Sequence, residues 1–247
     1  MGLTIHYGLS APVSLDPAGA RELVEAAREV ACRMQRRGAV EKVGPLRSDA
    51  GARRMAVAWL TLAVPGQRNT FTGLEVEPTE GSLFCVAIGK DCEPMRLGLF
   101  RYPATVRNQG QLRHTRLGRD WQLTGFSKTQ YASLHGWEHF LRCHRAVVDV
   151  LLGCQRVGMR VTISDEGSYW PGRRTATLRQ ILEESNGVVA AAAGAFKDLD
   201  DGSIGPRVKS PIFAHARFER LEAEGAARVG PRLRRLVRAV KERARNP

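Results

Sequence analysis

Aromatic residues and long apolar runs are scarce in this chain, and both shortages exclude classes of protein. Aromatic side chains make up 6% of the 247 residues, although a hydrophobic fraction of 43% is enough for a sizeable core. No stretch of about 18 uninterrupted apolar residues occurs, so no transmembrane helix is expected. The first residues lack a basic segment followed by an apolar run, so no signal peptide is expected. This pattern predicts a cytoplasmic protein.

The sequence also lacks the short motifs of several common enzyme classes. It contains no GxxxxGK[ST], GxGxxG, GxSxG or HExxH pattern, which argues against the usual NTPase, Rossmann, hydrolase and zincin sites. The five cysteines are an odd number without a CxxC pair, so neither a disulfide framework nor a zinc knuckle is expected. We therefore expect free thiols in a reducing compartment.

Positive charge is concentrated at the C-terminus. The net charge is +13, of which residues 228–247 contribute +7, so the rest of the chain is only mildly basic. Such a segment suits contact with a nucleic acid or another polyanion, and the alternative is a solvated tail. It has no aromatic side chains for stacking, which argues against sequence-specific recognition of single strands by the tail. The candidate nucleic-acid contacts are Arg232, Arg234, Arg235, Arg238, Lys241 and Arg243.

Hydrophobic periodicity predicts alternating strands and helices. Residues 3–9 are typical of a strand, and Asp16-Pro17 is typical of a helix N-terminus. Apolar residues at helical spacing predict helices ending near Gly38, at about 137–156, and from about 175 to 199. Further strands are predicted at 83–88, 95–102, 121–131 and 159–163. Residues 56–64 and 71–76 are either two more strands or part of an extended insertion.

The predicted order of elements indicates an α+β fold. It reads β-α-insert-β-β-β-α-β followed by helices, which suits a mixed or antiparallel sheet with helices on one face, an elaborated ferredoxin-like arrangement. Residues 101–119 are basic and rich in turn formers, which predicts a loop. Residues 1–205 are predicted to form the core domain, and residues 206–247 a helical extension that ends in the basic tail.

Residues 164–170, with the sequence SDEGSYW, are the most informative stretch. Two adjacent carboxylates, a glycine and two large aromatics lie where a strand ends, which is where α/β proteins build their sites. One interpretation makes Asp165 and Glu166 metal ligands or general acid/base groups. The other has Asp165 capping a turn, Gly167 at a positive φ, and the aromatics covering the end of the sheet.

Lys128 and Gln130 point to the same side of the strand predicted before the second helix. If that strand neighbours residues 161–163, Lys128 meets Asp165 or Glu166. A lysine beside paired carboxylates suits metal-assisted phosphodiester cleavage, with Lys128 stabilising the developing charge, and an ordinary salt bridge is the alternative. The candidate catalytic residues are thus Lys128, Asp165 and Glu166, and the candidate cofactor is a divalent metal.

Other residues near these segments are candidates for contact with ligands. His135, His139 and Cys143 recur at every fourth position and could hold a soft metal, but His135 is expected to precede the helix and no fourth ligand is evident. His144 falls on the apolar stripe of the helix, which predicts a hydrogen-bonded core histidine. The candidate substrate contacts are Gln130, Tyr169, Trp170 and Arg173.

Three segments resemble a family of bacterial proteins. They are residues 126–133 (FSKTQYAS), 140–144 (FLRCH) and 164–170 (SDEGSYW), which span the middle third of the chain. The resemblance implies no particular activity, cofactor or catalytic residue. It implies only that the three segments contribute to one site.

Three hypotheses follow from the sequence. The leading one is a binding protein whose basic surface, chiefly the tail, contacts nucleic acid or another polyanion. The second is a metal-dependent hydrolase of a phosphate-containing substrate. The third is an assembly subunit that uses Tyr169, Trp170 and the terminal helix as contact surfaces.

Overall fold

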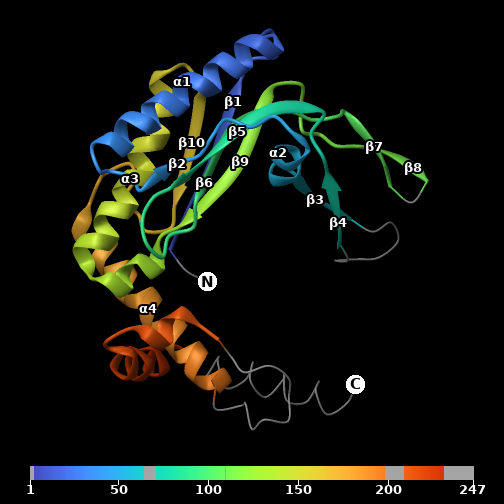
Figure 1. Ribbon diagram of the computed structural model, residues 1–247. Helices are drawn as coiled ribbons and strands as arrows, with labels where there is room; N and C mark the ends of the chain where they lie inside the picture. The colour runs from blue at the N-terminus through green and yellow to red at the C-terminus, as the bar shows by residue number, and fades with distance from the viewer. Residues whose placement is uncertain (1–2, 64–70, 109, 198–208, 231–247) are drawn as a thin grey trace.

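An antiparallel six-stranded sheet forms the centre of the protein (Figure 1). The computed structural model describes residues 3–63, 71–108, 110–197 and 209–230. The order across the sheet is β10-β1-β9-β6-β5-β2. Its strands are β1 (Thr4–Ala11), β2 (Lys42–Val43), β5 (Glu80–Ala87), β6 (Met95–Arg101), β9 (Trp121–Lys128) and β10 (Arg160–Asp165).

Four of these strands and two helices have the ferredoxin-like connectivity. Helix α1 (Pro17–Arg36) follows β1, and helix α3 (Trp137–Arg156) connects β9 to β10. Each crossover skips one place in the sheet, because β9 lies between β1 and β6, and β1 lies between β9 and β10. This split β-α-β pattern confirms the predicted α+β fold with a mainly antiparallel sheet.

Helices α1 and α3 cover one face of the sheet, which we call the closed face (Figure 1). Ile5, Tyr7 and Leu9 alternate along β1 with more exposed residues and join the main core under these helices. Helix α1 begins as predicted, because the Asp16 side chain accepts a hydrogen bond of 2.8 Å from the Gly19 backbone N–H.

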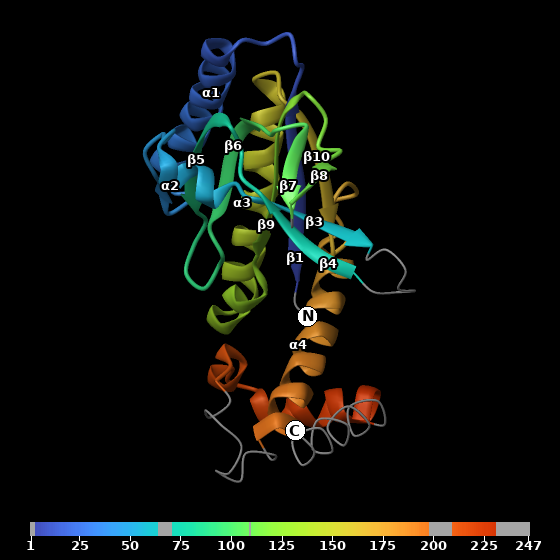
Figure 2. The ribbon, with the colours of Figure 1, turned by 90° about the vertical axis from the view of Figure 1, so that its right-hand side faces the viewer.

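The other face, the open face, carries shorter elements. Helix α2 (Ala50–Met55) packs Ala52 against Leu83 and Phe100 of the sheet. Strands β3 (Ala58–Ala63) and β4 (Phe71–Val76) form a separate ribbon that continues from α2 (Figure 2).

The predicted loop at 101–119 is wrong in part, because it contains a hairpin. Strands β7 (Thr105–Asn108) and β8 (Gln111–His114) pair with each other only, among the described residues. Neither strand is buried, and Leu112 is exposed, so the sequence has no alternation of apolar and polar residues to reveal a strand. Gly110 takes the positive φ that the turn requires.

Helix α4 (Thr175–Lys197) joins the main core to the C-terminal elements. Its first half contributes Leu178 and Leu182 to the main core. Its second half packs with Ile212 of the 3-10 helix η2 (Pro211–Ala214) and with the helical residues 218–230. The predicted domain boundary near residue 205 lies outside the described residues, and no described helix is long and apolar enough to cross a membrane.

Candidate functional site

Asp165 caps the turn after β10, as one of the two interpretations of the sequence predicts. Its carboxylate accepts hydrogen bonds of 2.7–2.9 Å from the backbone N–H groups of Gly167, Tyr169 and Trp170. The positive φ belongs to Ser168, not to Gly167 as the sequence suggested. A Cβ at Gly167 would lie 2.5 Å from the end of the Leu178 side chain, so a larger residue there would require that side chain to move.

Asp165 also ends a buried chain of polar side chains. Its Oδ1 lies 3.2 Å from His144 Nε2, and His144 Nδ1 lies 2.8 Å from the Thr129 hydroxyl. Burial alone would raise the pKa of Asp165, but the hydrogen bond and charge of His144 and the backbone donors outweigh burial and lower it. The order acid–imidazole–hydroxyl is that of a hydrolytic triad, yet the side chains of Asp165 and His144 and the whole of Thr129 are 0% exposed.

The polar network continues toward α4. Gln130 is fully buried, accepts from the Leu3 backbone N–H at 3.1 Å and donates to Asn186 at 2.9 Å. Asn186 in turn donates to Ser133 at 3.2 Å. The segments 126–133, 140–144 and 164–170 therefore meet through direct contacts between buried side chains. Buried polar networks of this kind help to fix one packing arrangement.

Lys128 is separated from the carboxylates by a strand. Strand β1 lies between β9 and β10, so the condition for a Lys128–Asp165 contact is not met. The Lys128 ammonium lies 4.7 Å from the ring centroid of Tyr131. Glu166 accepts from the Thr4 backbone N–H at 3.0 Å and lies 3.4 Å from His6 Nε2. Across the described ranges, no group of three or more His, Cys, Asp or Glu side chains could hold a metal ion.

The predicted substrate contacts are divided between the interior and the surface. Gln130 and Tyr169 are buried, and Tyr169 lies edge-on to the His144 ring. Trp170 is half-buried against the main core. Arg173 forms an ion pair of 3.0 Å with Asp149 of α3. Tyr169 and Arg173 thus attach the turn to α3, whereas Gln130 is bonded to Leu3 and to Asn186 of α4.

Residues 231–247 of the basic tail, which include its six candidate contacts, lie outside the described residues. Arg228, at the start of the tail, is described and lies 3.8 Å from Glu184 of α4.

A hollow with exposed aromatics lies elsewhere, on the open face between the sheet and the β3–β4 ribbon. It is a groove of about 660 Å³ lined by residues of β1, α2, β3, β6 and β9. His6 of β1 and Phe126 of β9 are direct cross-strand partners on its floor, with ring centroids 6.1 Å apart. Phe126 is 54% exposed and Trp59, on the opposite wall, is 70% exposed. Large apolar side chains that face solvent together are typical of contact surfaces.

Cationic and polar groups surround these aromatics. Arg54 of α2 and Arg96 of β6 line the groove, together with one acid, Glu93. Arg96 Nη1 donates to the Met55 carbonyl at 3.2 Å, which holds the guanidinium at the wall. The Tyr102 hydroxyl donates to the Ala56 carbonyl at 2.6 Å, and burial raises the pKa of Tyr102 to about 12. The groove therefore has a rigid, mildly basic wall.

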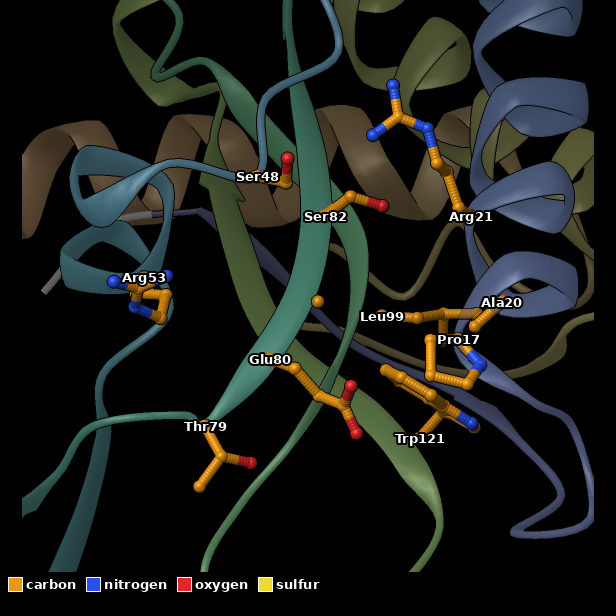
Figure 3. A pocket seen from close by; sticks show the side chains of 11 residues that line it. Pro17, Ala20, Arg21, Ser48, Arg53, Thr79, Glu80, Ser82, Leu99 and Trp121 are labelled. Atoms are coloured by element: carbon orange, nitrogen blue, oxygen red, sulfur yellow. The ribbon is translucent and has the colours of Figure 1, made fainter.

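A smaller pocket of about 280 Å³ lies beyond α2, at the start of α1 (Figure 3). Arg21 of α1 and Arg53 of α2 line it from opposite sides. Its acid, Glu80, is paired at 3.3 Å with Arg101, whose guanidinium lies over the Trp121 ring. Successive arginines of α2 thus reach two hollows, Arg53 this pocket and Arg54 the groove.

Sequence reasoning missed His6, Phe126 and Trp59. The signal was present, because alternation along the two predicted strands puts His6 and Phe126 on the face away from the core. The sequence did not indicate that β1 and β9 are neighbours in this register. It also did not indicate that a ribbon on the same side of the sheet brings Trp59 to the groove. Comparison with protein-family models, curated proteins and solved structures gives no match, so the resemblance to a bacterial family remains a prediction.

Proposed function

We propose that the protein binds single-stranded nucleic acid in the groove of the open face. The observation that carries the proposal is the exposed Phe126 ring beside His6, on the two central strands of a ferredoxin-like sheet. Rings that project from the centre of such a sheet stack on unpaired bases, which is how RNA-recognition sheets of this topology act. The partner is the nucleic acid that the net positive charge suggested, but the proposed contact lies on the sheet and not on the basic tail.

The chemistry of the groove suits a strand with exposed bases. Phe126 and Trp59 offer flat apolar surfaces, and each base stacked on such a ring contributes about 1–3 kcal/mol to binding. Arg54 and Arg96 supply charge for the phosphates beside the stacked bases. A double helix keeps its bases stacked on each other, so it gains nothing from the rings.

The test is fluorescence anisotropy with a labelled 12-nucleotide single strand, as RNA and as DNA, and with the matching duplex. Phe126→Ala is expected to weaken single-strand binding about tenfold through loss of one stacked base. Val13→Ala is the matched control, because Val13 is an exposed apolar residue in the connection from β1 to α1. Equal affinities of wild type and Phe126→Ala for the single strand would contradict the proposal.

Two further variants separate the groove from the tail. Arg54→Gln is expected to reduce the slope of log affinity against log salt by about 0.7, the value for one phosphate of a single strand. A chain ending at residue 230 is expected to bind more weakly but to remain sensitive to Phe126→Ala. If truncation abolishes all binding, the tail is the contact and the groove is not. If the molecular mass in solution rises with protein concentration, and if Trp59→Ala lowers that mass, a second copy of the chain occupies the groove instead.

A further inference from the structure

Residues 105–119 form an arm, which holds the β7–β8 hairpin and the segment after it. Figures 1 and 2 show the hairpin on the open side of the sheet, near the β3–β4 ribbon. None of its described residues belongs to a hydrophobic cluster of the core. A two-stranded hairpin without such packing is marginally stable in water, so the arm contributes little to the stability of the fold.

The charged side chains of the arm are all positive. Its four arginines have no Asp or Glu between them in the sequence, and they are Arg107, Arg113, Arg116 and Arg119. None of the four forms an ion pair with another described residue. The next acid along the chain, Asp120, is paired with Arg160 of β10 at 2.6 Å. The arm therefore presents positive charge that no carboxylate neutralises, which favours an anionic partner.

The register of the hairpin brings cationic and apolar groups to one face. Arg107 is opposite Leu112, and Thr105 is opposite His114. Cross-strand partners lie on the same face of an antiparallel pair. Leu112 is 64% exposed, and Arg107 and His114 are also exposed. An apolar side chain between cations fits a nucleic acid, because phosphates recur along its backbone and its unpaired bases have apolar faces.

The base of the arm is fixed at the wall of the groove. Tyr102 precedes the arm, lines the groove and donates to the carbonyl of Ala56, another lining residue. After β8, the buried Thr115 donates its hydroxyl to the Pro103 carbonyl at 2.7 Å, which closes the base. A chain spans at most about 3.6 Å per residue, so Arg107 lies within about 18 Å of Tyr102.

We propose that the arm binds phosphates of the nucleotides that extend from the groove, as a second contact with the same single strand. This inference rests on the proposed function, because the groove holds the bases next to those phosphates. Contacts with phosphates add affinity that depends on salt but carry no sequence information. The groove thus positions the strand by stacking, and the arm extends the binding site along its backbone.

The experiment measures the affinity of the full-length protein for labelled single strands of about 4 and about 16 nucleotides. These lengths bracket the site sizes of small single-strand-binding domains. The short strand is expected to occupy the groove alone, and the long strand to reach the arm as well. For wild type, we therefore expect the long strand to bind more tightly. We also expect its slope of log affinity against log salt to be steeper by about 0.7 for each added phosphate contact.

The arm variant carries Arg107→Gln and Arg119→Gln, which replace two exposed side chains. Its affinity for the long strand is expected to fall about tenfold at about 0.1 M salt, and the salt slope by about 1.4. Its affinity for the short strand is expected to be unchanged. The matched control carries Arg33→Gln and Arg36→Gln, at two exposed arginines in the last turn of α1, which covers the closed face.

Phe126→Ala separates the two proposals. If it weakens binding of both strands, and the arm variant weakens binding of the long strand only, both proposals are supported. If the arm variant binds the long strand as tightly as its control does, while Phe126→Ala weakens both strands, only the arm proposal is overturned. If Phe126→Ala binds both strands as tightly as wild type, the groove proposal fails, and the arm is not a second contact.

The molecular mass in solution tests a different occupant of the arm. If the arm variant lowers the mass of the protein without changing its affinity for the long strand, a second copy of the chain covers the arm. That result also overturns the arm proposal. Equal masses of wild type, arm variant and control, together with weaker binding of the long strand by the arm variant alone, support it.

Discussion

The two faces of the sheet differ in which side chains they bury and which they leave exposed to water. On the closed face, the polar side chains of Thr129, His144 and Asp165 are buried, and each lies within 3.2 Å of another member of this chain of groups. On the open face, Phe126 and Trp59 remain exposed to water, although their burial would stabilise the protein. An acid, an imidazole and a hydroxyl in hydrogen-bonding order therefore do not by themselves identify a catalytic site. A buried network fixes how the elements pack, whereas unburied rings are available to a partner.

The largest contrast is expected between two phenylalanines of the same sheet. Phe84→Ala removes a fully buried ring from the closed face and should lower the free energy of unfolding by about 3–5 kcal/mol. Phe126→Ala removes an exposed ring and should cost less than about 1 kcal/mol. Urea denaturation of both variants measures the difference. Equal losses would mean that the open face is covered in solution.

Two adjacent carboxylates should differ nearly as much. Asp165→Asn leaves His144 and three backbone donors poorly paired in the interior, so we expect the free energy of unfolding to fall by about 3 kcal/mol. Glu166→Gln, one residue further and half-exposed, should cost less than about 1 kcal/mol. Thermal unfolding at pH 7 distinguishes them, and the reverse order would return Asp165 to the status of a catalytic candidate.

A smaller effect is expected from a single hydroxyl. Thr129→Val keeps the shape but leaves His144 Nδ1 without its partner, which should lower the free energy of unfolding by about 1–2 kcal/mol. The matched control is Thr124→Val, on the exposed face of β9, which should be nearly neutral. If both variants unfold at the same urea concentration, the network does not stabilise the closed face.

The smallest expected effect is on the pH dependence of the free energy of unfolding. The pKa of Asp165 is lowered below its ordinary value of 3.8, so its ionised form stabilises the folded state. That stabilisation is present above about pH 4 and is lost as the pH falls through the lowered pKa of the folded protein. The free energy of unfolding of Asp165→Asn should therefore decline less between pH 5 and pH 3 than that of wild type. Parallel profiles would show that Asp165 has an ordinary pKa.

Local sequence signals determined the elements of the fold and part of the buried network. Asp16-Pro17 marks the start of α1, and the apolar stripe of 137–156 coincides with α3 and correctly places His144 in the core. The capping role of Asp165 is likewise local, because its donors lie within five residues of it. These features follow from hydrogen bonds and periodicities that span one or two turns of chain.

The tertiary structure alone decided which residues share a site. The sequence permitted Lys128 to reach Asp165, but β1 lies between their strands, and 37 residues of chain separation carry no information about that order. It gave no reason to pair His6 with Phe126. Strand order and register depend on how all the apolar faces are buried together, so contacts between distant segments appear only when the sheet is assembled.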